Sequence, residues 1–252
     1  MPEKRRLIDR LFQLGAPSVV IERRPPALSI ADGVWSLMRY LRMPGGPILP
    51  SRTTIVRLGS GNLAVISPPP AHEETFAALD GLGKVEALVA PNSFHYLYVD
   101  AAARRYPKAR VFLAPGLRSR IPSLPDGAEF SEAPVWVDLA HLTLGPVRGL
   151  SEVVFFHLPS CTLIFSDVAF NMVSLESRLD RFFWRLNGVP AHFGPSRTAR
   201  WMLLKDRQRA ADVLRRVLDW PFERIVVAHG DVLQADARAQ FERGFAAYLR
   251  DA

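Results

Sequence analysis

The sequence predicts a layered α/β protein, and three observations support this fold class. Apolar runs alternate with helical patterns over residues 63–114, which is the order of a β-α-β-α-β unit. Three later apolar runs, 153–157, 162–166 and 224–228, have the length and composition of buried strands. A chain of 252 residues, of which 48% are hydrophobic, is long enough to bury a substantial core.

The first 26 residues of the chain are expected to lie outside the domain. Leu7, Leu11 and Leu14 have helical spacing that ends before Pro25-Pro26, which predicts a peripheral arm over residues 1–26 and one domain over residues 27–252. Strands are expected at 30–35, 52–58, 63–67, 85–90 and 110–114. Helices are expected at 71–82 and 99–106. The turn Gly59-Ser60-Gly61-Asn62 joins two of these strands, which favours a hairpin.

The second half is expected to repeat the arrangement of strands followed by helices. A connection rich in proline and glycine covers residues 115–134. Strands are expected at 135–139, 153–157, 162–166 and 224–228, and helices at 206–218 and 235–249. Residues 172–200 carry aromatic and turn residues and are expected to cover a pocket. The two halves would then meet face to face.

Composition and charge restrict the classes of partner. The formal net charge is +7, but the arginines are scattered and match no nucleic-acid-binding motif, so no specific nucleic-acid partner is expected. An anionic substrate stays open. The single cysteine, Cys161, rules out a disulfide framework, and neither a signal peptide nor a transmembrane run is found, so a cytoplasmic protein with no membrane partner is expected. The oligomeric state is not predicted.

Three segments share one form, an apolar strand whose end carries a polar residue. They are VEALVAPNSFH, TLIFSD and RIVVAHG, and they present His95, Asp167 and His229. Strand ends at one edge of a sheet can bring distant residues together. Two imidazoles and one carboxylate are a sufficient ligand set for one catalytic zinc or ferrous ion.

In order and approximate interval, these segments resemble the metallo-β-lactamase superfamily. That family has a His-x-His-x-Asp-His loop after one strand, a Gly-Asp end on a later strand and a His-Gly end on the last. The resemblance covers roughly residues 30–250 and implies a four-layer αββα sandwich. It is nearest to a branch described as a domain of unknown function, whose members share an Ala-Pro-Asn loop start, a Phe-Phe-His strand and a Ser-Asp strand end.

The resemblance also implies which ligand positions are filled. Ser93, His95, Leu97 and Tyr98 match the histidines and aspartate of the family loop, so only His95 is retained there. Asp167 matches the metal-bridging aspartate and His229 the final histidine. A further histidine ligand of the family would fall near residues 146–149, and none of these residues is a histidine. Three of the family's seven ligand positions are filled, so a two-zinc site of the usual kind is not expected.

Two functions therefore stay open. The first is a divergent metal-dependent hydrolase with one zinc or iron ion on His95, Asp167 and His229, in which His95 and Asp167 take part in catalysis on an unknown small-molecule ester, amide or phosphoester. The second is a metal-free, non-catalytic binding or regulatory protein on the same scaffold. On that view Asp167 caps a turn and the histidines are structural. Glu152 is expected at the surface and His157 packed at a strand end.

Overall fold

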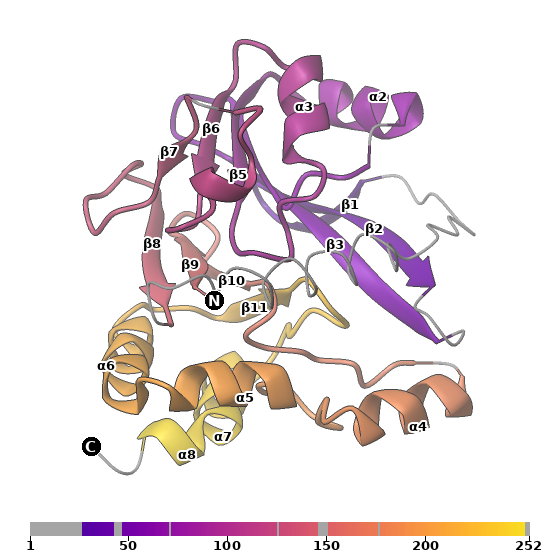
Figure 1. The fold of residues 1–252 in the computed structure, drawn as a ribbon, viewed down its shortest axis with the longest axis vertical. Helices are drawn as coiled ribbons and strands as arrows, with labels where there is room; N and C mark the ends of the chain where they lie inside the picture. The colour runs from indigo at the N-terminus through magenta and orange to yellow at the C-terminus, as the bar shows by residue number, and fades with distance from the viewer. Residues whose placement is uncertain are drawn as a thin grey trace.

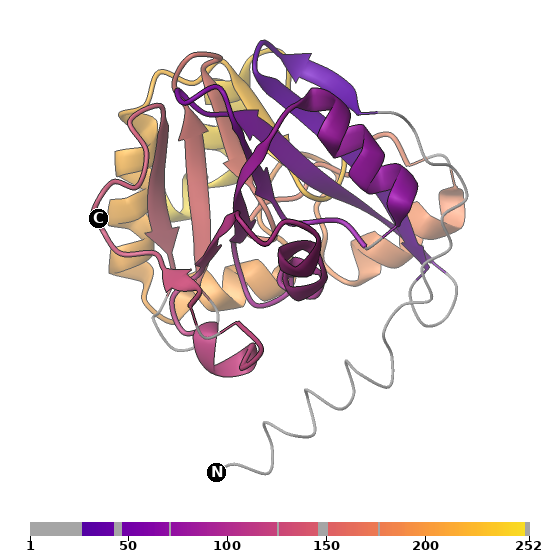
Figure 2. The ribbon, with the colours of Figure 1, turned by 90° about the horizontal axis from the view of Figure 1, so that it is seen from above.

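The computed structural model describes residues 27–42, 47–70, 72–124, 126–145, 151–175 and 177–249, without the side chains of Met202 and Leu204. Two β-sheets lie against each other between outer layers of helices (Figures 1 and 2). This is the αββα sandwich predicted from the sequence. The expected arm over residues 1–26 lies outside the described residues, and so do residues 146–150, where a further ligand was expected.

The first sheet has seven strands in chain order, β1 to β7. Strands β1 to β4 pair antiparallel, and β4 to β7 pair parallel. Their bounds are Leu28–Ala31, Val34–Arg42, Ile48–Arg57, Leu63–Ile66, Val85–Ala90, Arg110–Leu113 and Ala128–Glu129. The expected hairpin is confirmed as β3 and β4.

The second sheet has four strands in the order β11-β10-β9-β8. Strands β8 (Leu139–Leu144), β9 (Glu152–His157) and β10 (Thr162–Phe165) pair antiparallel, whereas β10 and β11 (Arg224–Val227) run parallel. In that parallel pair Phe165 lies opposite Val227. The register brings the residues that follow these two strands side by side.

Helices cover both outer faces. On the first sheet lie α2 (Glu73–Leu82) and α3 (Val99–Arg105), followed in the chain by a 3₁₀ turn, η1 (Arg118–Arg120). On the other side lie α5 (Arg197–Leu204), α6 (Arg207–Leu218), α7 (Ala237–Gly244) and α8 (Ala246–Leu249), whereas α4 (Arg178–Leu186) lies beside the start of β3. Among the described residues, no helix combines the length and apolar character needed to cross a bilayer.

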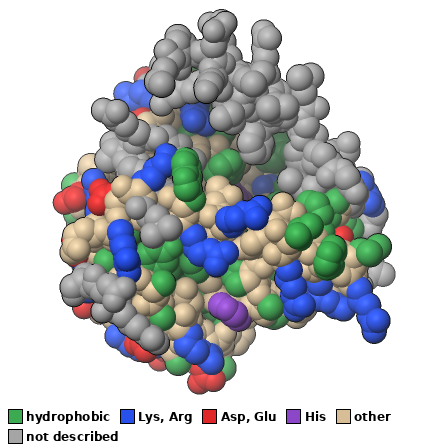
Figure 3. All heavy atoms as spheres, turned by 60° about the horizontal axis from the view of Figure 1, so that its bottom comes forward, with side chains coloured by type: hydrophobic (Ala, Val, Ile, Leu, Met, Phe, Trp, Pro, Cys, Tyr) green, Lys and Arg blue, Asp and Glu red, His purple; other side chains and the backbone are tan. Residues whose placement is uncertain are grey.

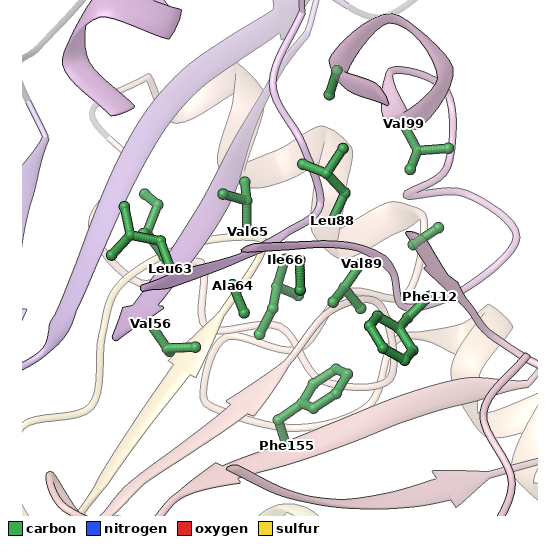
Figure 4. Packing of buried hydrophobic residues seen from close by; sticks show 14 of the residues in the cluster. Val56, Leu63, Ala64, Val65, Ile66, Leu88, Val89, Val99, Phe112 and Phe155 are labelled. Atoms are coloured by element: carbon green, nitrogen blue, oxygen red, sulfur yellow. The ribbon is translucent and has the colours of Figure 1, made fainter. Parts of the chain in front are cut away.

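The second sheet is buried on both faces, and its side chains alternate accordingly. In β9, Val153 and Phe155 join the core between the two sheets, whereas Val154 and Phe156 join the core beneath the helices. Figure 4 shows Phe155 pointing from the second sheet toward Val89 and Phe112 of the first. This double burial explains why β9 reads as a continuous apolar run.

Three expected elements are corrected by the structure. The strand over 30–35 is wrong, because Asp32-Gly33 forms the turn between β1 and β2 and Gly33 has a φ of +70°. The strand over 135–139 is also wrong: Val137 is 94% exposed, and β8 begins only at Leu139. The helix over 235–249 is divided, since α7 ends at Gly244, where the backbone of Phe193 packs too closely for a side chain.

Candidate metal centre

The two sheets bring three predicted residues to one point. His95 follows β5 of the first sheet, whereas Asp167 and His229 follow the parallel strands β10 and β11 of the second. Each of the latter two lies two residues beyond the Phe165–Val227 pair, so the register places them together. One ligand atom from each of the three residues lies within 4.8 Å of the others, which makes them a candidate metal site.

The hydrogen bonds of His229 fix its tautomer. Its Nδ1 lies 2.7 Å from the carbonyl oxygen of Pro50, and that oxygen can only accept. Nδ1 therefore carries the hydrogen, and in the neutral ring Nε2 holds a bare lone pair. The ring of Phe170 stacks on the imidazole with centroids 4.9 Å apart, so the ring cannot turn freely.

His95 is buried beside it. Its Nε2 lies 3.2 Å from Nε2 of His229 and 3.3 Å from Oδ2 of Asp167, while its Nδ1 has no partner among the described residues. Burial lowers the pKa of His95 despite the nearby carboxylate, and the charge of Arg39 adds to this effect. The imidazole is therefore neutral near pH 7, which is the form that binds a metal.

The cluster has more hydrogen-bond acceptor atoms than hydrogens available to donate to them. Nε2 of His229 lies 2.9 Å from Oδ1 of Asp167, and with the hydrogen on Nδ1 alone a lone pair faces a carboxylate oxygen. That contact is repulsive unless a proton or another cation lies between the two atoms. The donor set, two imidazole nitrogens and a carboxylate, is one that zinc and iron accept. The residues present therefore fit one metal ion.

Asp167 is suited to holding positive charge. Burial raises its pKa, but the adjacent His95 and His229 lower it more, so the net pKa lies well below the usual range. Its side chain is 22% exposed, which leaves one side of the cluster open to solvent. The carboxylate is therefore ionised near pH 7.

Two residues that sequence reasoning missed hold Asp167 in place. Glu152, expected at the surface, is 1% exposed, and its carboxylate accepts from the backbone N–H groups of Ser166, Asp167 and Val168 at 2.6–3.0 Å. Burial and the charge of Asp167 raise the pKa of Glu152 to about 7. The physical reason for the error is the isolated bridge between Glu152 and Asn92, which buries the start of β9 against the end of β5.

Asn92 links the two sheets at the cluster. Its Nδ2 donates to Glu152 at 2.9 Å and to Asp167 at 2.8 Å. Its Oδ1 accepts from the backbone N–H groups of Phe94 and His95, each at 2.9 Å. An asparagine directly after a buried strand is the sequence signal that could have identified this Asx turn.

Strand β3 anchors the His229 turn from the first sheet. The backbone N–H of Arg52 donates to Ala228 at 2.8 Å, and its guanidinium donates to the carbonyl oxygens of Val227 and Gly230. Gly230 has a φ of +109°, and a Cβ there would lie 2.1 Å from the carbonyl oxygen of Asn171. The glycine of the His-Gly pair is thus required by a close backbone approach.

The other candidate residues lie outside the cluster. His157 is packed at the far end of β9 from Glu152, where it contacts Ser160 and the carbonyl oxygen of Arg57, as expected. Leu97 is 59% exposed and offers no ligand atom. The ring of Tyr98 faces the guanidinium of Arg39 at 5.1 Å. Leu97 and Tyr98, which match ligand positions for the second metal of the metallo-β-lactamase superfamily, therefore provide no ligands for a second metal.

A family model described as a domain of unknown function, DUF4336, matches residues 32–199. The chain belongs to the DUF4336 family. The match includes β5, β9 and β10, and thus His95, Glu152 and Asp167, and it ends before His229. No curated protein matches the chain at a significant level.

Solved structures show the fold. A fragment named diflavin flavoprotein A 5, from Nostoc sp. PCC 7120, matches 88% of this chain and 95% of its own, with a TM-score of 0.61 and 12% identity. The DIM-1 metallo-β-lactamase matches 89% and 99%, with a TM-score of 0.59 and 13% identity. The FIM-1 metallo-β-lactamase from Pseudomonas aeruginosa, solved in its mono-zinc form, matches 90% and 100%, with a TM-score of 0.56 and 14% identity. The chain therefore has the metallo-β-lactamase fold.

Proposed function

We propose that this protein is a metal-dependent hydrolase that holds one zinc or iron ion on His95, Asp167 and His229. The observation that carries the proposal is the contact between Nε2 of His229 and Oδ1 of Asp167, which needs a cation. A metallo-β-lactamase of the same fold was solved with a single zinc, so a mononuclear site is compatible with this scaffold.

When bound, the metal would supply a Lewis acid and lower the pKa of a coordinated water. The residues of the chain do the rest. His95 presents a neutral imidazole nitrogen, and the Pro50 carbonyl fixes the orientation of His229 so that its Nε2 faces the cluster. Asp167 has too low a pKa to be an effective general base near pH 7, so it contributes negative charge that would hold the cation. The expected substrates are esters, amides or phosphoesters.

A metal-free binding or regulatory protein is the second candidate. It is favoured by Leu97 and Tyr98, which occupy positions where the metallo-β-lactamase superfamily has ligands for a second metal. In this case a proton occupies the contact between His229 and Asp167, and the cluster is a structural brace between the two sheets.

Metal content separates the two candidates. The full chain is purified without a histidine tag from metal-supplemented medium, and zinc, iron and manganese are quantified. We expect close to one equivalent of metal in the native protein and a loss of at least tenfold in affinity for His229→Ala and Asp167→Asn. His192→Ala, which removes an exposed histidine outside the cluster, is the matched control.

Activity is then tested on the metal-loaded protein with nitrophenyl esters and nitrophenyl phosphodiesters. Less than about 0.1 equivalent of metal per chain contradicts the hydrolase, because a preformed site of this kind binds tightly. Stoichiometric metal without turnover of any of these substrates supports metal binding and leaves a structural or regulatory role for it.

A further inference from the structure

We propose that the outer face of α4 and α5 docks on an anionic lipid surface. Leu179, Phe182 and Leu186 are spaced at i, i+3 and i+7, so they form one stripe along α4. They are 80%, 67% and 67% exposed. A stripe of large apolar side chains with this exposure is typical of a helix that meets an apolar surface.

The orientation of α4 is fixed by its opposite side. Nε1 of Trp184 donates to the carbonyl oxygen of Ile48 at 2.8 Å, and Oδ1 of Asp180 accepts from the backbone N–H of Ile48 at 3.3 Å. Both contacts hold the helix against the start of β3. The apolar stripe therefore cannot turn inward without breaking them. In Figures 1 and 2 the helix lies at the periphery of the molecule.

Helix α5 begins beside the end of α4. The backbone N–H of Arg197 and the guanidinium of Arg200 donate to the carbonyl oxygen of Gly188, just beyond the end of α4, at 3.0 and 3.1 Å. Trp201 follows and is 54% exposed, with Nζ of Lys205 lying 3.6 Å from its ring centroid. An exposed tryptophan beside a cation is the pair expected where a protein meets lipid headgroups.

The charges around the stripe are mainly positive. Five exposed cations belong to these two helices and the residue after them: Arg178, Arg185, Arg197, Arg200 and Lys205. Arg178 and Arg185 form no ion pair with a carboxylate of the described residues. Figure 3 shows blue and green side chains side by side over this face of the molecule. Cations around apolar side chains are complementary to an anionic bilayer.

The same features argue against other occupants. A second copy of this chain would bring arginines of like charge together, which opposes association through this face. A helical partner would need a groove, whereas these side chains project from the periphery with more than half of their surface exposed. A bilayer accepts projecting side chains because its surface deforms around them.

The proposed docking differs from one expectation drawn from the sequence and does not depend on the metal site. No membrane partner was expected because no segment of the sequence could span a bilayer. A helix that lies in the interface needs only one apolar side, so the length criterion does not exclude it.

The test measures binding of the full chain to vesicles by co-sedimentation. Vesicles of phosphatidylcholine alone are compared with an equimolar mixture of phosphatidylcholine and phosphatidylglycerol. We expect binding only to the mixed vesicles, weakening as salt is raised. Phe182→Ser with Leu186→Ser should reduce the partition coefficient roughly 100-fold, because each apolar side chain that no longer enters the bilayer lowers it roughly tenfold. Arg178→Gln with Arg185→Gln should reduce it roughly tenfold at low salt.

The matched control is Val137→Ser with Lys108→Gln, which removes one exposed apolar residue and one exposed cation elsewhere in the chain. It should bind like the native protein. Circular dichroism checks that each variant is folded. The proposal is overturned if native protein ignores the mixed vesicles at low salt, or if the α4 variants and the control bind equally. It is also overturned if the α4 variants instead convert a dimer to a monomer, since the face would then belong to a second copy.

Discussion

Removing the carboxylate of Glu152 tests how the cluster is held together. This side chain is 1% exposed and accepts four hydrogen bonds. Ser166 donates to Oε1 at 2.7 Å, whereas Asp167, Val168 and Asn92 donate to Oε2 at 2.6, 3.0 and 2.9 Å. Glu152→Ala leaves all four donors without a partner, and Glu152→Gln leaves only the Ser166 N–H facing an amide nitrogen.

The expected losses in the free energy of unfolding follow from this count. An unpaired buried donor costs about 1–3 kcal/mol. The glutamine variant should therefore lose about 1–3 kcal/mol. The alanine variant should lose about 3–5 kcal/mol rather than four full penalties, because water can enter the space and satisfy some of the donors.

Urea denaturation of the metal-free protein measures both losses without a contribution from metal binding. Glu223→Gln, which changes an exposed glutamate, is the control and should lie within about 0.5 kcal/mol of the native protein. Equal losses for Glu152→Ala and Glu152→Gln would refute the reasoning, since they differ in the number of donors left unpaired. In the metal-loaded protein, Glu152→Ala should also weaken metal binding by about 10- to 100-fold, because the backbone N–H of Asp167 and the side chain of Asn92 lose their common acceptor.

Three further perturbations test other parts of the structure. Gly230→Ala should lower the free energy of unfolding by about 2–4 kcal/mol, because the new Cβ meets the Asn171 carbonyl. Gly61→Ala should lower it by about 1–2 kcal/mol, because Gly61 has a φ of +81° but no atom within 4 Å of the new Cβ. Burial lowers the pKa of His157 in the folded protein, so the unfolded chain takes up a proton first as pH falls. The free energy of unfolding should therefore decline below about pH 6.5. His157→Gln should flatten that decline, as measured by urea denaturation at a series of pH values. Arg52→Lys should lower stability by about 1–3 kcal/mol, because a single ammonium cannot reach both carbonyl partners of the guanidinium.

Each of these has an outcome that would contradict it. Similar losses at Gly230 and Gly61, measured by urea denaturation, would mean that the close approach of Asn171 is not limiting. An unchanged slope of stability against pH for the His157 variant would mean that this histidine does not govern the acid limit. Full stability of Arg52→Lys would mean that the β3 anchor on the His229 turn is dispensable.

Much of this architecture could be predicted from local sequence pattern. Strands such as Val85–Ala90 and Thr162–Phe165 are short apolar runs bounded by turn residues, and such runs are buried wherever they pack. Errors arose where the pattern was ambiguous. Val137 is apolar yet exposed, and no local feature distinguishes its segment from a strand.

Part of the candidate site could likewise be predicted from the sequence, and part could not. That His95, Asp167 and His229 follow strand ends is visible in the sequence, and so is the loss of ligands at Leu97 and Tyr98. The burial of Glu152 is not visible, because a glutamate before a strand is usually solvated. Only its pairing with Asn92, from a different sheet, excludes water from it.

The sequence by itself determined the fold class, the strand ends that carry polar residues, and the glycine that follows His229. Only the tertiary structure decided that these strand ends meet and that Pro50 fixes the His229 tautomer. It also decided that the apolar stripe of α4 faces outward. The physical reason is that strand pairing and burial depend on residues far apart in the chain. The register between β10 and β11 forms only when the second sheet assembles, and the contact of β3 with the His229 turn forms only when the two sheets pack.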